Sequence, residues 1–341
     1  MMEEIFEQPE ALERTFRAER GHAAEFRAFA QKNRFRMILL VARGTSDNAA
    51  LFGRYLFELT TGIPVSLCAP SIYTIYGAKI ELRDTLVVGI SQSGEGTDVN
   101  RVLESARAQG AYTIAITNEA RSPMARMVDD VFLARAGRQH SVAATKTYTT
   151  QLLLLYLLAF ALGREITLSD VSEVPDRARR VLKLAPEIAE LVERYRYMRQ
   201  CVVVGRGLNY ANAFELALKL METCYVVADR FSSADFLHGP IALIERDFPV
   251  LLLMPPGKTF AELHQLIGRL ESLRAETVVI TSADAKLPKV GRAIRVPGKF
   301  PEIYSPIPYI IPGQLFAASL ARIKGLDADQ PRSLEIVTRT V

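Results

Sequence analysis

Continuous apolar runs alternate with amphipathic stretches along the first half of the chain, and this alternation predicts a parallel sheet covered by helices. The predicted strands are the apolar runs at 37–42, 65–67, 85–90, 112–117 and 131–133. Strands that are buried on both faces form unbroken apolar runs of this kind. Helical spacing fills the stretches between them, for example 49–60 and 98–109. The predicted fold class is therefore α/β, with a doubly wound parallel sheet in three αβα layers.

The same order of elements returns in the second half of the chain. Three pairs of apolar segments match in order: 200–207 with 37–44, 250–254 with 86–90, and 277–282 with 113–118. The first and last pairs are offset by 163 (207 − 44) and 164 (277 − 113) residues. Landmarks at one spacing predict two copies of one α/β unit. The expected segments are a helical lead-in at 1–35, a first subdomain at 36–165, a second subdomain at 176–325 and a tail at 326–341.

Further stretches have helical or linking character. Residues 1–32 combine Glu and Arg with spaced apolar side chains, which predicts one charged lead-in helix. Residues 163–175 are polar and are predicted as a linker, and 175–197 as one long amphipathic helix. The most apolar stretch, 152–162, is well short of the roughly 20 residues that cross a bilayer, so it is predicted to be a buried helix.

Composition narrows the classes of protein that this chain can represent. With 341 residues, 49% apolar and 23% charged, it has the make-up of an ordinary globular protein. A net charge of +4 without a basic block predicts no nucleic-acid partner. Three scattered cysteines favour a reducing compartment, and four histidines without ligand spacing predict no metal; we expect no other cofactor. The N-terminus lacks the apolar core of a signal peptide, so we expect a cytoplasmic protein without membrane contact.

The turn after the third predicted strand is the first candidate site. It contains Ser91, Gln92, Ser93 and Thr97 with two glycines, and it leads directly into a predicted helix. A helix N-terminus offers free N–H groups and a positive dipole end, and glycines allow a ligand close to the backbone. The turn has neither a Walker A nor a GxGxxG sequence. It predicts a phosphate site for a small metabolite; a polar turn that only caps the helix is the alternative.

A second hydroxyl-bearing turn, with Thr45 and Ser46, follows the first predicted strand. Ligands of doubly wound sheets bind at the carboxyl ends of the strands, so the two turns could meet over one ligand. The Thr-rich stretch with Ala143 and Lys146 leads into the apolar helix. Its small and hydroxyl-bearing residues suit a helix N-terminus near a ligand, and they equally suit a helix that packs tightly on the sheet. In the second copy, residues 255–258 are Pro-Pro-Gly-Lys, so only the first copy is expected to hold phosphate.

Titratable side chains gather in the second copy. Glu215, Lys219 and Glu222 share one face of the predicted helix 211–225, by their i,i+4 and i,i+3 spacing. The apolar residues of that helix leave little free surface, so some of these charges are expected to point into a cavity or an interface. A solvated, salt-bridged stripe is the alternative. His238 lies in a loop beside Gly-Pro, where a catalytic histidine and a hydrogen-bonded loop histidine both fit.

Several motifs, in order along the chain, resemble the sugar-isomerase (SIS) family. They are Ala42-Arg43-Gly44-Thr45-Ser46, Ser91-Gln92-Ser93-Gly94-Glu95, Ala143-Ala144-Thr145-Lys146, the helix with Glu215 to Glu222, Leu237-His238-Gly239-Pro240 and the tail at 327–332. The resemblance extends from residue 37 to the end of the chain. Within the family, the chain resembles the isomerase half of the glutamine–fructose-6-phosphate aminotransferases, and it also resembles free-standing amino-sugar-phosphate deaminases. The resemblance implies two SIS subdomains and a homodimer.

The resemblance also implies roles for the matching residues. The phosphate and hydroxyl groups of a hexose or hexosamine phosphate are held at the two turns by Ser46, Ser91, Gln92 and Ser93, with Thr45, Thr97, Ala143 and Lys146 as further candidates. Glu222 is the base for enolisation at C1–C2, and Lys219 lies beside it. His238 assists ring opening and comes from the neighbouring subunit. A carboxylate and an imidazole suit these proton transfers at neutral pH.

The chain departs from the family's pattern at three places. No glutaminase half and no N-terminal cysteine precede the motifs, so we expect that the chain does not hydrolyse glutamine itself. Gly96 stands where the family has a Thr in the phosphate turn, with Thr97 one place later. Ile336 stands where the aminotransferases have the lysine that forms an imine with the ketose.

The missing lysine matters less in the catabolic direction, because glucosamine 6-phosphate already carries nitrogen at C2. We therefore expect an amino-sugar-phosphate deaminase and isomerase, which converts glucosamine 6-phosphate to fructose 6-phosphate and ammonia. The enzymatic alternatives are a synthase-like isomerase without glutaminase and a fructosamine-6-phosphate deglycase. The other alternative is a non-catalytic sugar-phosphate sensor, against which the set Glu222, Lys219 and His238 speaks.

Overall fold

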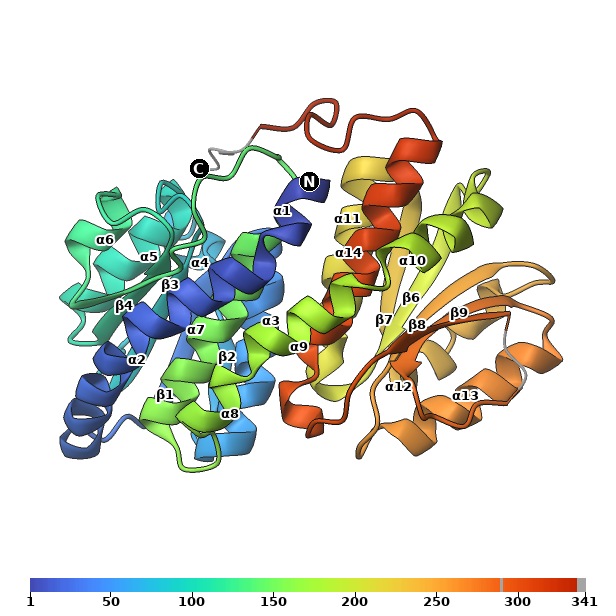
Figure 1. Ribbon diagram of the computed structural model, residues 1–341. Coiled ribbons are helices and arrows are strands. Elements are labelled where there is room, and N and C mark those ends of the chain that lie inside the picture. Colours follow the sequence, from blue (N-terminus) through green and yellow to red (C-terminus); the bar gives the residue numbers. More distant parts are fainter. Residues whose placement is uncertain (289–290, 336–341) are drawn as a thin grey trace. The chain divides into compact units, whose positions relative to one another are not determined.

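The computed structural model describes residues 1–288 and 291–335, and the ten strands in that range form two five-stranded sheets (Figure 1). The first sheet has the order β2-β1-β3-β4-β5, and the second has the order β7-β6-β8-β9-β10. Both sheets therefore share one topology, and every strand pairing in them is parallel. The three-layer α/β fold class and the internal repeat predicted from the sequence are confirmed.

The chain divides into two compact units, each containing one sheet. The first unit is built from Glu7–Gln139 and Ala144–Pro175. Its strands are β1 (Met37–Ala42), β2 (Val65–Leu67), β3 (Thr85–Ile90), β4 (Tyr112–Thr117) and β5 (Asp130–Leu133). Its helices are α2 (Gln8–Lys32), α3 (Thr45–Thr61), α4 (Ser71–Thr74), α5 (Thr97–Ala108), α6 (Pro123–Met127), α7 (Lys146–Leu162) and α8 (Leu168–Ser172).

Alternate side chains of β1 face opposite helical layers, as expected for a central strand. Leu39 belongs to the core cluster that contains Val102 of α5, together with residues of α4 and α6. Leu40 points to the other face, where it lies near Gly53 of α3 and Leu155 of α7. Helix α2 packs along α7 in that second layer. Both faces of the sheet are thus covered, which is why its strands are continuously apolar.

The second unit is built from Met1–Phe6, His140–Ala143 and Asp176–Ser333. Its strands are β6 (Gln200–Gly205), β7 (Val227–Ser232), β8 (Pro249–Met254), β9 (Glu276–Ser282) and β10 (Arg292–Val296). Its α-helices are α1 (Met2–Phe6), α10 (Ala185–Leu191), α11 (Tyr210–Cys224), α12 (Ser233–Leu237), α13 (Phe260–Ser272) and α14 (Pro306–Ile323), and α9 (Val174–Leu182) leads into them. Short 3-10 helices are η1 (Val192–Tyr195), η2 (Gly207–Asn209), η3 (Pro240–Leu243) and η4 (Glu302–Tyr304). Helices α11 and α14 pack together, whereas α12 and α13 share a core with β6 and β8.

Two of the predicted helices are interrupted, each near a proline. The lead-in at 1–32 is not one helix but α1 and α2, and Pro9 lies in the first turn of α2. The stretch 175–197 is likewise divided into α9, α10 and η1, with Pro186 in the first turn of α10. Proline lacks the N–H that a continuing helix needs but suits the first turn of a new one, so the chain restarts its helix at these points.

The most apolar stretch forms the buried helix α7, as predicted. Residues 152–158 are each 0% exposed. A helix that is apolar on all sides is covered on all sides. Within the described residues, no helix combines the length and the apolar character that crossing a bilayer demands. The predicted linker after α7 contains the short α8, which Thr167 caps by accepting a hydrogen bond from the N–H of Asp170 at 3.1 Å.

Candidate functional site

The two hydroxyl-bearing turns start side by side at one edge of the first sheet. Strands β1 and β3 are hydrogen-bonded neighbours, and their last residues, Ala42 and Ile90, are register partners. The chain then turns into α3 after β1 and into α5 after β3. In this strand order, β1 and β3 flank the point where the connections reverse direction, and ligands of such sheets bind there. The structure thus brings together the two turns that the sequence singled out.

Backbone N–H groups orient two serines of the turn after β3. The N–H of Gly94 donates to Ser91 Oγ at 3.1 Å, and the N–H of Glu95 donates to Ser93 Oγ at 3.3 Å. Each hydroxyl therefore already accepts a hydrogen bond and keeps its O–H to donate to a ligand oxygen. Gly94 has a φ of 64°, and a Cβ there would lie 2.3 Å from Ser122 Oγ, so this position requires glycine.

The other predicted residues of this turn differ in exposure. Gln92 is half-buried, and its carbonyl accepts hydrogen bonds from Thr117 Oγ1 at 3.2 Å and from the N–H of Asn118 at 3.0 Å. Thr97 is exposed and is the first residue of α5. Gly96 has a φ of −57°, and the nearest atom to a Cβ there would be 3.7 Å away. A side chain therefore fits at Gly96, and nothing around this position demands glycine.

The turn after β1 is shorter than the sequence suggests. The sequence predicts the helix over 49–60, but α3 begins at Thr45, because Gly44 with its φ of 57° turns the chain directly from strand to helix. Thr45 is half-buried and Ser46 is 8% exposed, both in the first helical turn. Arg43 Nε pairs with Asp98 Oδ2 at 2.5 Å, and this ion pair ties the turn after β1 to the start of α5.

In the second unit, a side chain of the protein itself occupies the equivalent turn. Between β8 and α13, Glu302 accepts hydrogen bonds from the N–H of Lys258 at 2.6 Å and from Thr259 Oγ1 at 2.9 Å. A Cβ on Gly257 would lie 2.1 Å from the carboxylate of Glu302. A carboxylate therefore takes the place at this helix N-terminus that a bound anion would take. That only the first copy holds phosphate stays a prediction.

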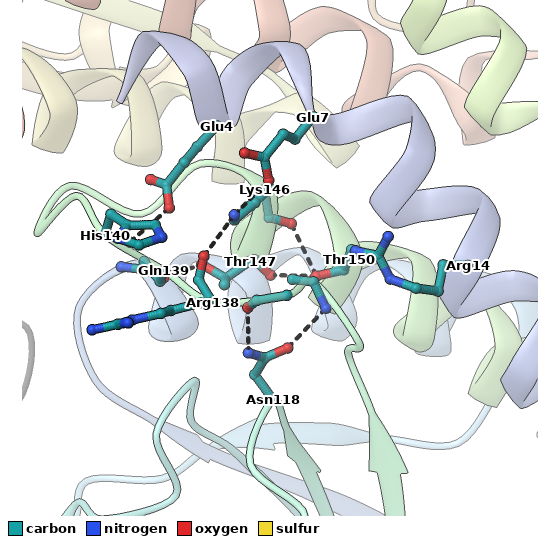
Figure 2. A network of polar contacts seen from close by, with 12 residues as sticks. Glu4, Glu7, Arg14, Asn118, Arg138, Gln139, His140, Lys146, Thr147 and Thr150 are labelled. Carbon is teal, nitrogen blue, oxygen red and sulfur yellow. Dashed lines mark hydrogen bonds and ion pairs between the residues drawn. The ribbon is translucent and has the colours of Figure 1, made fainter.

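Lys146 lies in a network of polar contacts at the start of α7 (Figure 2). Lys146 is 1% exposed. Its ammonium pairs with the Glu7 carboxylate at 2.7 Å and donates a hydrogen bond to the carbonyl of Arg138 at 2.7 Å. The neighbouring Thr147 Oγ1 donates to Gln139 Oε1 at 2.8 Å. These contacts fix the start of α7 to the chain that precedes it. Lys146 thus has partners within the protein, and its contact with a sugar phosphate stays a prediction.

Ala143 lies in the segment 140–143, which belongs to the second unit. Ala143 is 0% exposed, and the N–H of Val142 donates to the carbonyl of Asp329 at 3.0 Å. The segment therefore runs beside the C-terminal tail. Since the side chain of Ala143 is a buried methyl group, a polar contact with a ligand could come only from its backbone.

The described part of the tail is anchored close to the end of α11. The guanidinium of Arg332 lies 4.0 Å from the ring centroid of Tyr225, and the N–H of Arg332 donates to the Tyr225 hydroxyl at 2.9 Å. Tyr225 is the residue that ends α11, with a φ of 54°. Ile336, which takes the position of the imine-forming lysine in the resemblance, lies outside the described residues.

The three charged residues predicted to share a face of α11 form one buried ionic group. Lys219 Nζ is 2.6 Å from Glu222 Oε2 and 3.5 Å from Glu215 Oε1. The side chains of Lys219 and Glu215 are 1% and 0% exposed, whereas that of Glu222 is 20% exposed. Burial alone would lower the pKa of Lys219, but the charges of Glu215 and Glu222 outweigh it and raise the pKa. The alternative of a solvated stripe is wrong, and Glu222 is the member that a ligand can reach.

His238 ends the short helix α12 and is exposed. Its backbone N–H donates to the carbonyl of Asp235 at 3.1 Å. Its imidazole makes no hydrogen bond or ion pair with any part of the chain that the structure describes, so nothing there restrains it as a structural loop histidine. Among those residues, no group of three or more His, Cys, Asp or Glu side chains is arranged to hold a metal ion.

Sequence reasoning missed two side chains that border the turns. Gln151 of α7 is 1% exposed and donates from Nε2 to Ser46 Oγ at 3.0 Å. Glu302 closes the turn in the second unit. The signal for Gln151 was an amide at the head of the most apolar helix. For Glu302 no local signal exists, because it follows that turn by more than 40 residues.

Two features of the repeated α/β unit define the class of this protein. The first copy contains a candidate anion site, and the second copy contains a buried carboxylate–lysine group. The family model of the SIS domain matches residues 31–161 and 195–289. The chain belongs to the SIS domain family.

Within the family, the chain is similar in sequence to known aminotransferases. Over 344 aligned residues, the chain is 36% identical to glutamine–fructose-6-phosphate aminotransferase [isomerizing] of Pyrococcus horikoshii; the match covers 98% of this chain and 56% of the relative. The chain therefore spans about half the length of the curated relatives it matches.

Solved structures agree on the fold. The C-terminal domain of glucosamine-fructose-6-phosphate aminotransferase from Francisella tularensis has a TM-score of 0.86 and 27% identity, covering 97% of this chain and 98% of that one. Glucosamine-6-phosphate deaminase from Thermotoga maritima has a TM-score of 0.80 and covers 99% of both chains. Its 22% identity supports a shared fold only.

Proposed function

We propose that this protein is an amino-sugar-phosphate deaminase and isomerase, which converts glucosamine 6-phosphate and water to fructose 6-phosphate and ammonia. The buried ionic group of α11 carries the proposal, because Glu222 alone among its members has an exposed edge. The ammonium of Lys219 at 2.6 Å is the counter-charge for a carboxylate at that position. A partly exposed carboxylate fixed in this way suits the removal of a proton next to a carbonyl.

The first-copy turns are the proposed phosphate site. Ser46, Ser91 and Ser93 each accept a hydrogen bond from the protein and have an O–H left to donate. The N-termini of α3 and α5 add backbone N–H groups, which suit a phosphate dianion. The expectation that a hexose phosphate binds there also rests on the aminotransferase relatives, whose names include fructose 6-phosphate.

The proposed reaction runs through an enolamine. His238 assists ring opening, and the open-chain sugar carries an aldehyde at C1 and an amine at C2. Glu222 takes the C2 proton while the C1 oxygen gains a proton, which forms the enolamine; a proton is then delivered to C1, which leaves a hydroxyl at C1 and an iminium at C2. Water adds to C2, the C–N bond breaks, and ammonia leaves with fructose 6-phosphate as the other product.

The sequence near the C-terminus supports the proposed catabolic direction. Aligned on the tail motif, Ile336 takes the position of the lysine that forms an imine with the ketose. A reaction that starts from fructose 6-phosphate would lack that amine. Deamination needs no such group, because the substrate brings its own nitrogen at C2.

We further propose a homodimer in which the loop with His238 serves the site of the partner subunit. The exposed imidazole without partners in the described chain supports this part of the proposal. Sedimentation analysis and mixing of two inactive variants, Glu222→Gln and His238→Ala, test it. Activity that reappears in the mixture supports a shared site, and two inactive variants that stay inactive after subunit exchange contradict it.

A panel of amino-sugar phosphates with ammonia detection tests the proposed reaction. Glucosamine 6-phosphate is expected to yield ammonia and fructose 6-phosphate in equal amounts, with EDTA present. If no hexosamine phosphate in the panel releases ammonia, the proposal is wrong. A sensor would instead raise its melting temperature with sugar phosphate while leaving the sugar unchanged.

The identity to the aminotransferase relatives favours a second candidate, an isomerase that works in the synthetic direction with ammonia supplied from elsewhere. Incubation of fructose 6-phosphate with ammonium salts distinguishes the two. Formation of glucosamine 6-phosphate at a rate above that of its breakdown supports the second candidate. Fructosamine 6-phosphate in the same panel tests the deglycase alternative.

A further inference from the structure

One buried amide beside the phosphate turns has an unexplained arrangement. Gln151 is the sixth residue of α7 and is 1% exposed. Its Nε2 donates to Ser46 Oγ at 3.0 Å. Its Oε1 is buried and has no hydrogen-bond partner among the described residues. An unsatisfied buried oxygen is unfavourable, so an amide kept in this position calls for a reason.

The residues that follow Gln151 in α7 show that packing does not require an amide at this position. Residues 152–158, which follow it in α7, are all 0% exposed, and Leu or Tyr occupies each position. An apolar residue at position 151 would pack in the same layer and leave no oxygen unpaired. The amide is therefore not explained by packing, and its one hydrogen bond, to Ser46, is what distinguishes it.

That hydrogen bond fixes the role of the Ser46 hydroxyl. A hydroxyl has one proton to donate and two lone pairs to accept with. Because Nε2 of Gln151 donates to it, Ser46 Oγ acts as acceptor toward the protein. No other hydrogen bond of this hydroxyl exists in the described chain, so its proton remains for a ligand. A phosphate dianion can only accept, and an O–H that itself accepts a hydrogen bond is a stronger donor.

We infer that Gln151 is a positioning residue, which holds the hydroxyl of Ser46 as a donor toward the phosphate of the substrate. The inference rests on the proposed function, since it takes the first-copy turns as the phosphate site. It adds a third serine to the pattern of Ser91 and Ser93, whose oxygens accept from backbone N–H groups in the same turn. For Ser46, the hydrogen-bond donor is the side chain of Gln151 from another helix, whereas for Ser91 and Ser93 it is a backbone N–H.

The internal repeat supplies a matched control. Gln314 of α14 lies 163 residues after Gln151 (314 − 151), which is the offset between the two copies, and it is 0% exposed. The turn of that copy holds Glu302 in place of an external anion. Replacement of Gln314 by Met therefore makes the same chemical change in a copy that is not expected to bind phosphate.

Calorimetric titration with fructose 6-phosphate, and separately with inorganic phosphate, tests the inference. Gln151→Met is expected to weaken both ligands about tenfold, the effect of one hydrogen bond to a charged group. Gln151→Glu is expected to weaken them further, because its carboxylate accepts the Ser46 proton and repels the phosphate. Gln314→Met should bind as the wild type does. In a Ser46→Ala background, Gln151→Met should cause no further loss.

Each outcome decides a different claim. Wild-type protein that binds neither ligand overturns the proposed function and with it this inference. Wild-type binding with an unchanged affinity in Gln151→Met, or an equal loss with and without Ser46, overturns the inference alone. A purely structural role for Gln151 would lower the melting temperature and leave affinity unchanged. Should Gln151→Met fail to fold, Gln151→Leu and Gln151→Glu carry the same comparison.

Discussion

Replacement of Lys219 by Met is the perturbation whose outcome the structure defines best. The variant leaves Glu215, which is 0% exposed, without the ammonium 3.5 Å away, and Glu222 without its partner at 2.6 Å. Removal of one partner from a buried ionic group strands a charge and costs about 3–5 kcal/mol of unfolding free energy. The exposed Lys299, which is paired with Asp284 at 3.3 Å, is the matched control, and Lys299→Met should change stability by less than about 0.5 kcal/mol.

Urea unfolding followed by far-UV circular dichroism measures this difference. The double variant Glu215→Gln/Lys219→Met removes the stranded charge and should recover at least half of the loss. The penalty in Lys219→Met should also shrink as the pH falls, because a proton can then neutralise the stranded carboxylate. If Lys219→Met is as stable as Lys299→Met, or its loss does not depend on pH, the reasoning about the buried group is refuted.

Two further predictions concern the first unit. Gly94→Ala places a Cβ 2.3 Å from Ser122 Oγ at a φ of 64°, so it should lower the free energy of unfolding by about 1–3 kcal/mol and weaken phosphate binding. Gly96→Ala, the control, should be close to neutral in both respects. Thermal unfolding and calorimetry compare the two variants, and equal effects would contradict the geometry. The hydrogen bond to Asp130, with help from Glu19, raises the pKa of His22 from 6.5 to about 10. A raised pKa adds stability that is complete below about pH 6.5 and is lost as the pH rises toward 10. His22→Gln should therefore destabilise by about 1.5–3 kcal/mol at pH 6 and progressively less toward pH 10, and a constant difference across that range would contradict the assignment.

The sheets were predictable because strands that are buried on both faces appear in the sequence as continuous apolar runs. The apolar runs at 85–90 and 112–117 coincide with β3 and β4, and the repeat follows from their spacing. Helix boundaries were less predictable near Pro9 and Pro186. Each proline fits both the end of one helix and the first turn of the next, and only the surrounding packing decides between them.

The candidate site was predictable where its chemistry is local in sequence. Ser91 and Ser93 follow a strand and precede a helix, and that order alone indicates an anion site. The roles of Gln151 and Glu302 depend on which distant elements pack beside the turns, and sequence spacing carries no such information. Burial of the charges on α11 was predictable only in part. The apolar residues of that helix indicated that some of its charges point into a cavity or an interface, but the same i,i+4 pattern occurs on solvated helices and does not tell which side chains are buried.

The rate of ammonia release from glucosamine 6-phosphate in Glu222→Gln tests the central claim most directly. The matched control is Glu193→Gln, at an exposed glutamate of the same unit that is paired only with Arg196 among the described residues. We predict that kcat falls about 10²–10⁴-fold in Glu222→Gln while fructose 6-phosphate binds within about threefold of wild type, and that Glu193→Gln behaves as wild type. Ammonia release by Glu222→Gln at the wild-type rate would contradict the account.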